Sequence, residues 1–196
     1  MVLPAGKAIN HGVHGGHGES EMIESRRVAV SAVVHLFLVL LFGLVAAPAR
    51  AQTSAAPLFA ATLHDYGDKP FAFERLRGKP LIVNFWARWC GPCKKEIPEL
   101  AAVHDHFAKS GLVVVGIALD DKVEATSDFA KAYEMRYTGL LAKSGGIALM
   151  QAIGNPKAVV PFTLVIDRNG LVVGSKLGAM NKSEIEAAAR QILGNP

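Results

Sequence analysis

The chain has 196 residues, a formal net charge of +4 and a charged fraction of 19%. Its basic residues are dispersed rather than gathered in a block, so nucleic-acid binding is not among the expected functions. This length predicts one domain preceded by an extension.

The N-terminal part has the features of a targeting segment. Residues 1–20 are rich in Gly and His, and residues 1–27 are expected to be a disordered tail that ends in the basic pair Arg26-Arg27. Residues 28–51 combine an apolar run with the small-x-small site Ala49-Arg50-Ala51, the pattern of a secretory signal peptide. The apolar run is also long enough to span a bilayer, so an uncleaved inner-membrane anchor is the alternative. Both interpretations place the remaining chain outside the cytoplasm, facing the periplasm.

Two further features of this tail leave alternatives open. Met22 offers a second start, from which the leader would have an ordinary signal length. His11, His14 and His17 are evenly spaced and suggest metal binding. Chelation by a flexible Gly-rich chain would cost a large ordering entropy, so a solvated tail is the expected state.

Residues 52–57 are expected to be an Ala-rich linker and residues 58–196 the domain. Apolar runs predict six strands, at residues 59–63, 71–73, 81–86, 112–119, 162–166 and 171–175. Helical spacing predicts four helices, at residues 90–109, 123–136, 145–153 and 182–193. Pro98 should kink the first helix, and Asn181 with Glu184 should form a capping box on the last. The order predicts an α/β domain with parallel central strands and an antiparallel final hairpin.

The only two cysteines, Cys90 and Cys93, lie three residues apart where the strand at 81–86 gives way to a helix. Free N–H groups and the partial positive charge at a helix N-terminus stabilise an anion. Cys90 should therefore have a lowered pKa and act as the nucleophile. Cys93 lies one turn further along, should be more buried, and should attack the mixed disulfide formed at Cys90.

Two other uses of the cysteine pair are weaker. A disulfide that closes so short a loop adds little stability, because loop-closure entropy grows with loop length. A structural zinc site needs four ligands, and the chain has no other cysteine. Thiol–disulfide exchange is the expected chemistry, and it needs no cofactor or metal.

The segment N-F-W-A-R-W-C-G-P-C, residues 84–93, resembles the active site of thioredoxin-like proteins. Together with the leader, it makes the chain similar to the exported TlpA/ResA-type thiol:disulfide oxidoreductases, over roughly residues 59–193. The resemblance implies a thioredoxin-like fold, with a central mixed β-sheet flanked by helices and an N-terminal β-hairpin extension.

The resemblance also implies which residues contact a substrate. Trp89, Gly91 and Pro92 belong to the cysteine motif, and Trp89 should shape the docking surface. Val160 and Pro161 match the cis-proline loop of the family, so a cis bond beside the cysteines is expected. The Val160 backbone would then pair with an extended substrate segment. A trans proline at a strand start is the alternative.

Asn84 stands where thioredoxins carry a buried acid that accepts the proton of the second cysteine. In the exported branch a glutamate three residues after that cysteine can take this role, and Glu96 holds the position. The alternative for Glu96 is a solvated helix glutamate. Trp86 is expected in the core, and Arg88 at the exposed edge of the site.

The Gly-Pro pair between the cysteines resembles reducing thioredoxins rather than oxidising DsbA-like proteins. A reductase in an oxidising periplasm needs electrons from across the membrane, which implies a DsbD/CcdA-type membrane donor. The substrates would be protein disulfides or dithiols, and cytochrome c maturation or envelope thiol homeostasis are the implied roles.

Two rival functions come from other classes. A peroxiredoxin-like antioxidant enzyme has its cysteine in a Thr-x-x-Cys context, but Ala87 holds the threonine position. A thioredoxin-fold metallochaperone or binding module of the copper-delivering type uses CxxxC and a distant histidine. His64, His104 and His106 show no such setting.

Overall fold

The computed structural model describes residues 54–120 and 122–194. All of them belong to one compact unit, Ala51–Pro196. The predictions for residues 1–53, including the tail, the histidines and the signal peptide or anchor, lie outside the described residues. Within the described part, no helix is long and apolar enough to cross a membrane.

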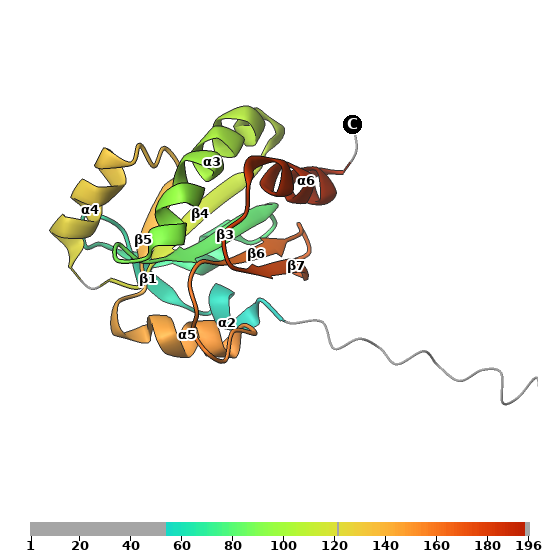
Figure 1. The fold of residues 1–196 in the computed structure, drawn as a ribbon. Coiled ribbons are helices and arrows are strands. Elements are labelled where there is room, and N and C mark those ends of the chain that lie inside the picture. Colours follow the sequence, from blue (N-terminus) through green and yellow to red (C-terminus); the bar gives the residue numbers. More distant parts are fainter. Residues whose placement is uncertain (1–53, 121, 195–196) are drawn as a thin grey trace, which may run out of the picture. The chain divides into compact units, whose positions relative to one another are not determined.

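One mixed sheet forms the centre of the domain (Figure 1). Its strands are β1 (Thr62–His64), β2 (Pro70–Ala72), β3 (Leu81–Trp86), β4 (Val113–Ala118), β5 (Thr138–Leu141), β6 (Phe162–Ile166) and β7 (Val172–Leu177). The order is β2-β1-β5-β4-β3-β6-β7. β3, β4 and β5 run parallel, and every other pairing is antiparallel. The expected mixed sheet with a hairpin extension and a final antiparallel hairpin is therefore confirmed.

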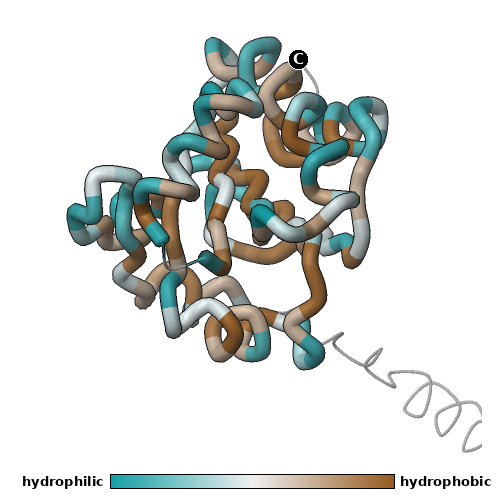
Figure 2. The backbone as a smooth tube through the Cα atoms, turned by 60° about the vertical axis from the view of Figure 1, so that its left-hand side comes forward, coloured by the Kyte–Doolittle hydropathy of each residue, from teal (hydrophilic) through white to brown (hydrophobic). Residues whose placement is uncertain are grey.

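Helices cover both faces of this sheet. They are α2 (Ala56–Phe59), α3 (Gly91–Phe107), α4 (Val123–Ala132), α5 (Gly146–Ala152) and α6 (Lys182–Leu193), with short 3-10 turns at Phe73–Leu76, Ala108–Ser110 and Lys143–Gly145. Figure 1 shows α3 and α6 on one face and α2 and α5 on the other. The hydrophobic segments run through the middle of the domain, as the brown tube in Figure 2 shows. β3 is buried along its whole length between the two layers, as its continuous apolar run predicts.

The start of the domain differs from the expected linker and strand. Residues 56–59 form the short helix α2, with Pro57 in its first turn, where a missing N–H costs nothing. Leu58 and Phe59 are buried in the core below the sheet. Because this burial holds residues 56–59 in a helical turn, β1 begins only at Thr62. Just before α2, Ser54 forms an isolated antiparallel bridge with Leu171.

Most other elements lie where the sequence places them. β3 and β6 have the predicted bounds, and Asn181 and Glu184 form the predicted capping box. α3 ends at Phe107 and passes through a 3-10 turn to Gly111, whose φ of 90° needs a glycine. α4 ends at Ala132, four residues earlier than predicted, because the chain then leads into β5, a strand that was not predicted from the sequence.

Candidate active site

The two cysteines lie at the carboxyl end of β3, where the chain enters α3. Cys90 is the N-cap of α3 and Cys93 lies in its first turn. The two form a disulfide with an S–S distance of 2.03 Å, and the Cys93 N–H donates to Cys90 Sγ at 3.2 Å. Gly91 and Pro92 begin the helix and are exposed. The sulfur that receives this N–H is therefore the one placed to carry a thiolate.

Exposure differs sharply between the cysteines and their neighbour. Cys90 is 4% exposed and Cys93 1%, whereas Trp89 is 74% exposed. Trp86 is fully buried as predicted, and its ring stacks on Phe129 of α4 at 5.1 Å between centroids. An exposed indole beside a shielded disulfide forms an apolar surface that a partner protein can cover.

The loop before β6 completes the site. Val160 and Pro161 are joined by a cis peptide bond, as the family resemblance implies. Val160 packs against the cluster that contains both cysteines, so the loop lies beside the disulfide. Asn155 braces the loop, because its side chain donates to Val159 O at 2.8 Å and accepts from Val159 N at 3.2 Å. Asn155 was not predicted from the sequence; its signal is an asparagine in the turn-forming run G-N-P-K.

Glu96 is buried, which excludes the solvated alternative. Its carboxylate accepts from Asn84 Nδ2 and from the Met180 backbone N–H, both at 2.9 Å. Asn84 Nδ2 also donates to Thr163 Oγ1 at 2.9 Å. Burial raises the pKa of Glu96 above its ordinary 4.5, while the hydrogen bonds from Met180 and Asn84 oppose that rise. The carboxyl lies about one helical turn beyond Cys93, and it is a buried ionisable group on the helix that begins at the cysteines.

Arg88 is half-buried rather than exposed at the edge. Its backbone N–H and its Nε each donate to Asp120, at 3.1 Å, and the two side chains form an ion pair. Asp120 follows β4, so this pair joins the loop before Cys90 to the end of the neighbouring strand. Asp120 was not among the predicted site residues, since nothing in the local sequence links positions 88 and 120.

Comparison with known proteins agrees with this arrangement. The family model described as AhpC/TSA family matches residues 53–175. This chain belongs to the AhpC/TSA family. The described residues contain no cluster of three His, Cys, Asp or Glu that could hold a metal ion.

Relatives of this AhpC/TSA-family chain include the thiol-disulfide oxidoreductase ResA of Bacillus subtilis. It is 31% identical over 134 residues, which are 68% of this chain and 72% of ResA. A ResA of Bacillus cereus is 28% identical over 137 residues, which are 70% and 76% of the two chains.

Solved structures of the same kind superpose on the domain. A thioredoxin-family thiol:disulfide interchange protein from Chlorobium tepidum TLS is 30% identical with a TM-score of 0.61, over 76% of this chain and all of the other. The dsbF protein of MTB is 25% identical, also at 0.61, over 69% and 97%. The fold is thioredoxin-like, and the chain is a thiol-disulfide oxidoreductase.

Proposed function

We propose that this oxidoreductase works outside the cytoplasm as a reductase of protein disulfides, with Cys90 attacking and Cys93 resolving. The observation that carries the proposal is the Cys90–Cys93 disulfide at the N-terminus of α3, beside the Val160–Pro161 loop. In the oxidised state Cys90 Sγ accepts a hydrogen bond from the Cys93 N–H. In the reduced state the same N–H and the positive end of the helix dipole would stabilise a thiolate at Cys90.

The reaction balances without a cofactor. The Cys90 thiolate attacks one sulfur of a substrate disulfide, so an enzyme–substrate disulfide forms and a substrate thiolate leaves. Cys93 loses its proton to Glu96 and attacks Cys90 Sγ, and the second substrate thiolate leaves and is protonated. Two electrons thus pass from the enzyme to the substrate, and the Cys90–Cys93 disulfide forms.

Two parts of the site would hold the substrate. Trp89, with Gly91 and Pro92, presents an exposed surface around the disulfide. The backbone of Val160, just before Pro161, would pair with an extended segment of the substrate, as an added strand pairs with a sheet edge. We assign these five residues to substrate binding, and Cys90, Cys93 and Glu96 to catalysis.

Location and partners follow from the direction of the reaction. Residues 28–51 would serve as a signal peptide or an inner-membrane anchor that places the domain in the periplasm. A DsbD/CcdA-type membrane protein would restore the dithiol. Apocytochrome c cysteines, or other envelope thiols, would be the clients. Mass spectrometry of the N-terminus of the exported protein decides between a cleaved signal and an anchor.

The reduction potential tests the direction. The purified protein is equilibrated with defined glutathione or dithiothreitol buffers, and the reduced fraction is read by thiol alkylation. A value near the roughly −270 mV of thioredoxin supports a reductase. A value near the roughly −120 mV of DsbA makes the enzyme an oxidant, and absence of a reversible two-electron couple contradicts exchange altogether.

A further inference from the structure

One row of residues crosses the sheet below α3. Gly139 on β5 pairs with Gly116 on β4, Gly116 pairs with Asn84 on β3, and Asn84 pairs with Thr163 on β6. Residues in register on neighbouring strands point to the same face of the sheet, and Asn84 points toward α3 because it bonds Glu96. The row therefore runs from Gly139, which has no side chain, to Asn84, the hydrogen-bond partner of Glu96.

Aromatic side chains from elsewhere fill the space above the two glycines. A Cβ at Gly139 would collide with the Tyr66 ring and its Oη, and a Cβ at Gly116 would lie 2.9 Å from Tyr137 Cε2 and 3.2 Å from Trp86 Nε1. Strands in a sheet are about 4.8 Å apart, so the positions of Gly139, Gly116 and Asn84 along the row are separated by steps of that size. The distance from Asn84 to the position of Tyr66 Oη is then on the order of 10 Å.

The polar atoms above this row are buried and unpaired. Tyr66 Oη, Tyr137 Oη, Trp86 Nε1 and Asn84 Oδ1 have no hydrogen-bond partner in the described part of the chain. The fifth such atom there, His104 Nδ1, belongs to a ring 6.4 Å from that of Tyr137. Natural proteins leave few buried polar atoms unsatisfied, and several together mark a place where internal water binds.

The groups along the row can also pass a proton. Burial raises the pKa of Tyr66, and burial first, with the nearby ionisable groups of Tyr66 and Glu96 second, raises the pKa of Tyr137. Both phenols therefore stay protonated at neutral pH, and each can donate and accept a hydrogen bond at the same time. A chain of water molecules between such groups needs both properties.

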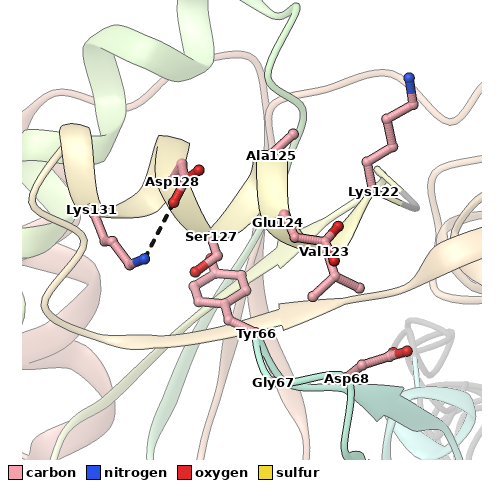
Figure 3. A pocket seen from close by; sticks show the side chains of 10 residues that line it. All are labelled: Tyr66, Gly67, Asp68, Lys122, Val123, Glu124, Ala125, Ser127, Asp128 and Lys131. Carbon is pink, nitrogen blue, oxygen red and sulfur yellow. Dashed lines mark hydrogen bonds and ion pairs between the residues drawn. The ribbon is translucent and has the colours of Figure 1, made fainter.

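The outer end of the row reaches solvent. The ring of Tyr66 lines an open cleft of about 760 Å³ between the turn that follows β1 and helix α4 (Figure 3). Asp68 and Asp128 line the same cleft, and in Figure 3 the Tyr66 ring lies beside Ser127. The Tyr66 hydroxyl is buried at the inner end of this ring, over Gly139, so the side chain separates the cleft from the row.

We propose that Tyr66, Tyr137, Trp86 and Asn84 hold internal water molecules that connect Glu96 to the cleft beside Tyr66. The role of this hydration site rests on the proposed function. When Cys93 attacks Cys90 Sγ, its proton passes to Glu96, and the water chain carries that proton to solvent. No electrons move along the row. Glu96 is enclosed by α3, β3 and the chain at Met180, and the hydration site lets its carboxyl lose the proton before the next turnover.

Stability tests the hydration site without any assay of exchange. If Tyr137 Oη binds water, Tyr137→Phe removes satisfied hydrogen bonds and lowers the urea midpoint of unfolding. If the pocket is dry, the same change removes an unpaired hydroxyl and raises the midpoint. Tyr66→Phe should behave alike, and the double variant should lose less than the sum if both hydroxyls bind the same water chain. A raised midpoint for Tyr137→Phe overturns the proposal.

Tyr133→Phe is the matched control. Tyr133 follows α4 and stacks on Phe129 with centroids 4.2 Å apart, but its hydroxyl is not among the buried unpaired atoms. The control variant should leave the midpoint close to that of the parent protein. A fall as large as that of Tyr137→Phe would show that the loss does not depend on a buried unpaired hydroxyl, and would overturn the hydration site.

Kinetics tests the proton route. The resolving step is followed by stopped-flow tryptophan fluorescence in weak and in concentrated imidazole buffer. Tyr66→Phe and Tyr137→Phe should slow this step several-fold in weak buffer, and concentrated imidazole should restore it, with the reduction potential unchanged. Unchanged rates, or slowing that buffer does not rescue, overturn the route. If the parent protein shows no resolving step at all, the proposed function fails instead, while the stability result still decides the hydration site.

Discussion

Asn84 on β3 and Glu96 on α3 are joined by a hydrogen bond of 2.9 Å, which links the central strand to the helix that carries both cysteines. The same amide group donates to Thr163 on β6. The carboxylate is therefore held in one orientation by two strands and by the backbone at Met180. An amide at position 84 cannot take a proton, so Glu96 is the one acid in this hydrogen-bonded group.

Replacement of either cysteine should separate the two steps of exchange. Cys93→Ser should accumulate a mixed disulfide with a substrate protein, because Cys90 still attacks and nothing resolves the product. Cys90→Ser should form none, since it removes the attacking sulfur at the N-cap of α3. Non-reducing electrophoresis and mass spectrometry measure the adduct. An adduct on Cys93 in the Cys90→Ser variant would reverse the assigned roles.

Glu96→Gln should change how stability depends on pH. Burial raises the pKa of Glu96 in the folded protein, so folding favours its protonated form. The resulting stability is fully present below the unfolded-state pKa, near 4.5, and is lost as the pH rises through the raised folded-state value. The variant should lack this fall, so urea midpoints of the two proteins should diverge above pH 4.5. Parallel curves would contradict the raised pKa.

Asn84→Ala should raise the pKa of Glu96 further, because it removes a hydrogen bond to the charged form. It should also cost roughly 1–3 kcal/mol of stability by leaving Thr163 and Glu96 with one partner fewer. The pKa can be followed by NMR of the labelled carboxyl. Thr126→Ala is the control, since it removes the hydrogen bond from Thr126 Oγ1 to Lys122 O on α4, worth about 1 kcal/mol, and should leave that pKa unchanged.

Arg88→Ala should raise the pKa of the Cys90 thiol more than Asp120→Asn does. The alanine leaves the Asp120 carboxylate, 9% exposed, without its guanidinium near the loop that leads to Cys90. Uncompensated negative charge disfavours a thiolate, so the pKa of the Cys90 thiol in the reduced enzyme should rise and its alkylation at neutral pH should slow. The asparagine removes the charge together with the salt bridge, at a cost of about 1 kcal/mol. Equal alkylation rates in both variants would exclude an electrostatic role.

Trp89→Ala should weaken the reaction with protein substrates and spare the fold. An indole that is 74% exposed contributes little to stability, so the free energy of unfolding should stay within about 0.5 kcal/mol. kcat/KM for a protein disulfide should fall about tenfold or more if Trp89 is covered on docking. The rate with a small aromatic disulfide serves as the internal control and should change little.

Elements defined by local chemistry could be predicted from the sequence. The apolar runs of β3 and β6 have no competing pattern, and the Asn181–Glu184 box is complete within four residues. β5 could not be predicted, because four residues containing a glycine become a strand only through pairing with β4 and β1. α2 was missed for a similar reason: the burial of Leu58 and Phe59 against the sheet holds it in place.

The site divides in the same way. The cysteines, Glu96 and Pro161 could be found because each belongs to a short pattern or to a family motif. Asp120 and Asn155 carry no such pattern, and their partners are recognised only once the loops are folded. The unpaired hydroxyls of Tyr66 and Tyr137 could not be predicted from the sequence either, since the burial of these side chains over Gly139 and Gly116 depends on the register of three strands.

The bridge between Ser54 and Leu171 determines at which end of the sheet the domain would be attached through its N-terminal side. The end of β6 pairs with the start of β3, and Leu171 follows the turn after β6. The disulfide follows the other end of β3. The six residues of β3 separate these two ends by roughly 20 Å. A tether applied just before residue 54, whether to a bilayer, a resin or an electrode, would therefore grip the base of the sheet. The redox-active tip would point outward and stay free to meet a large partner.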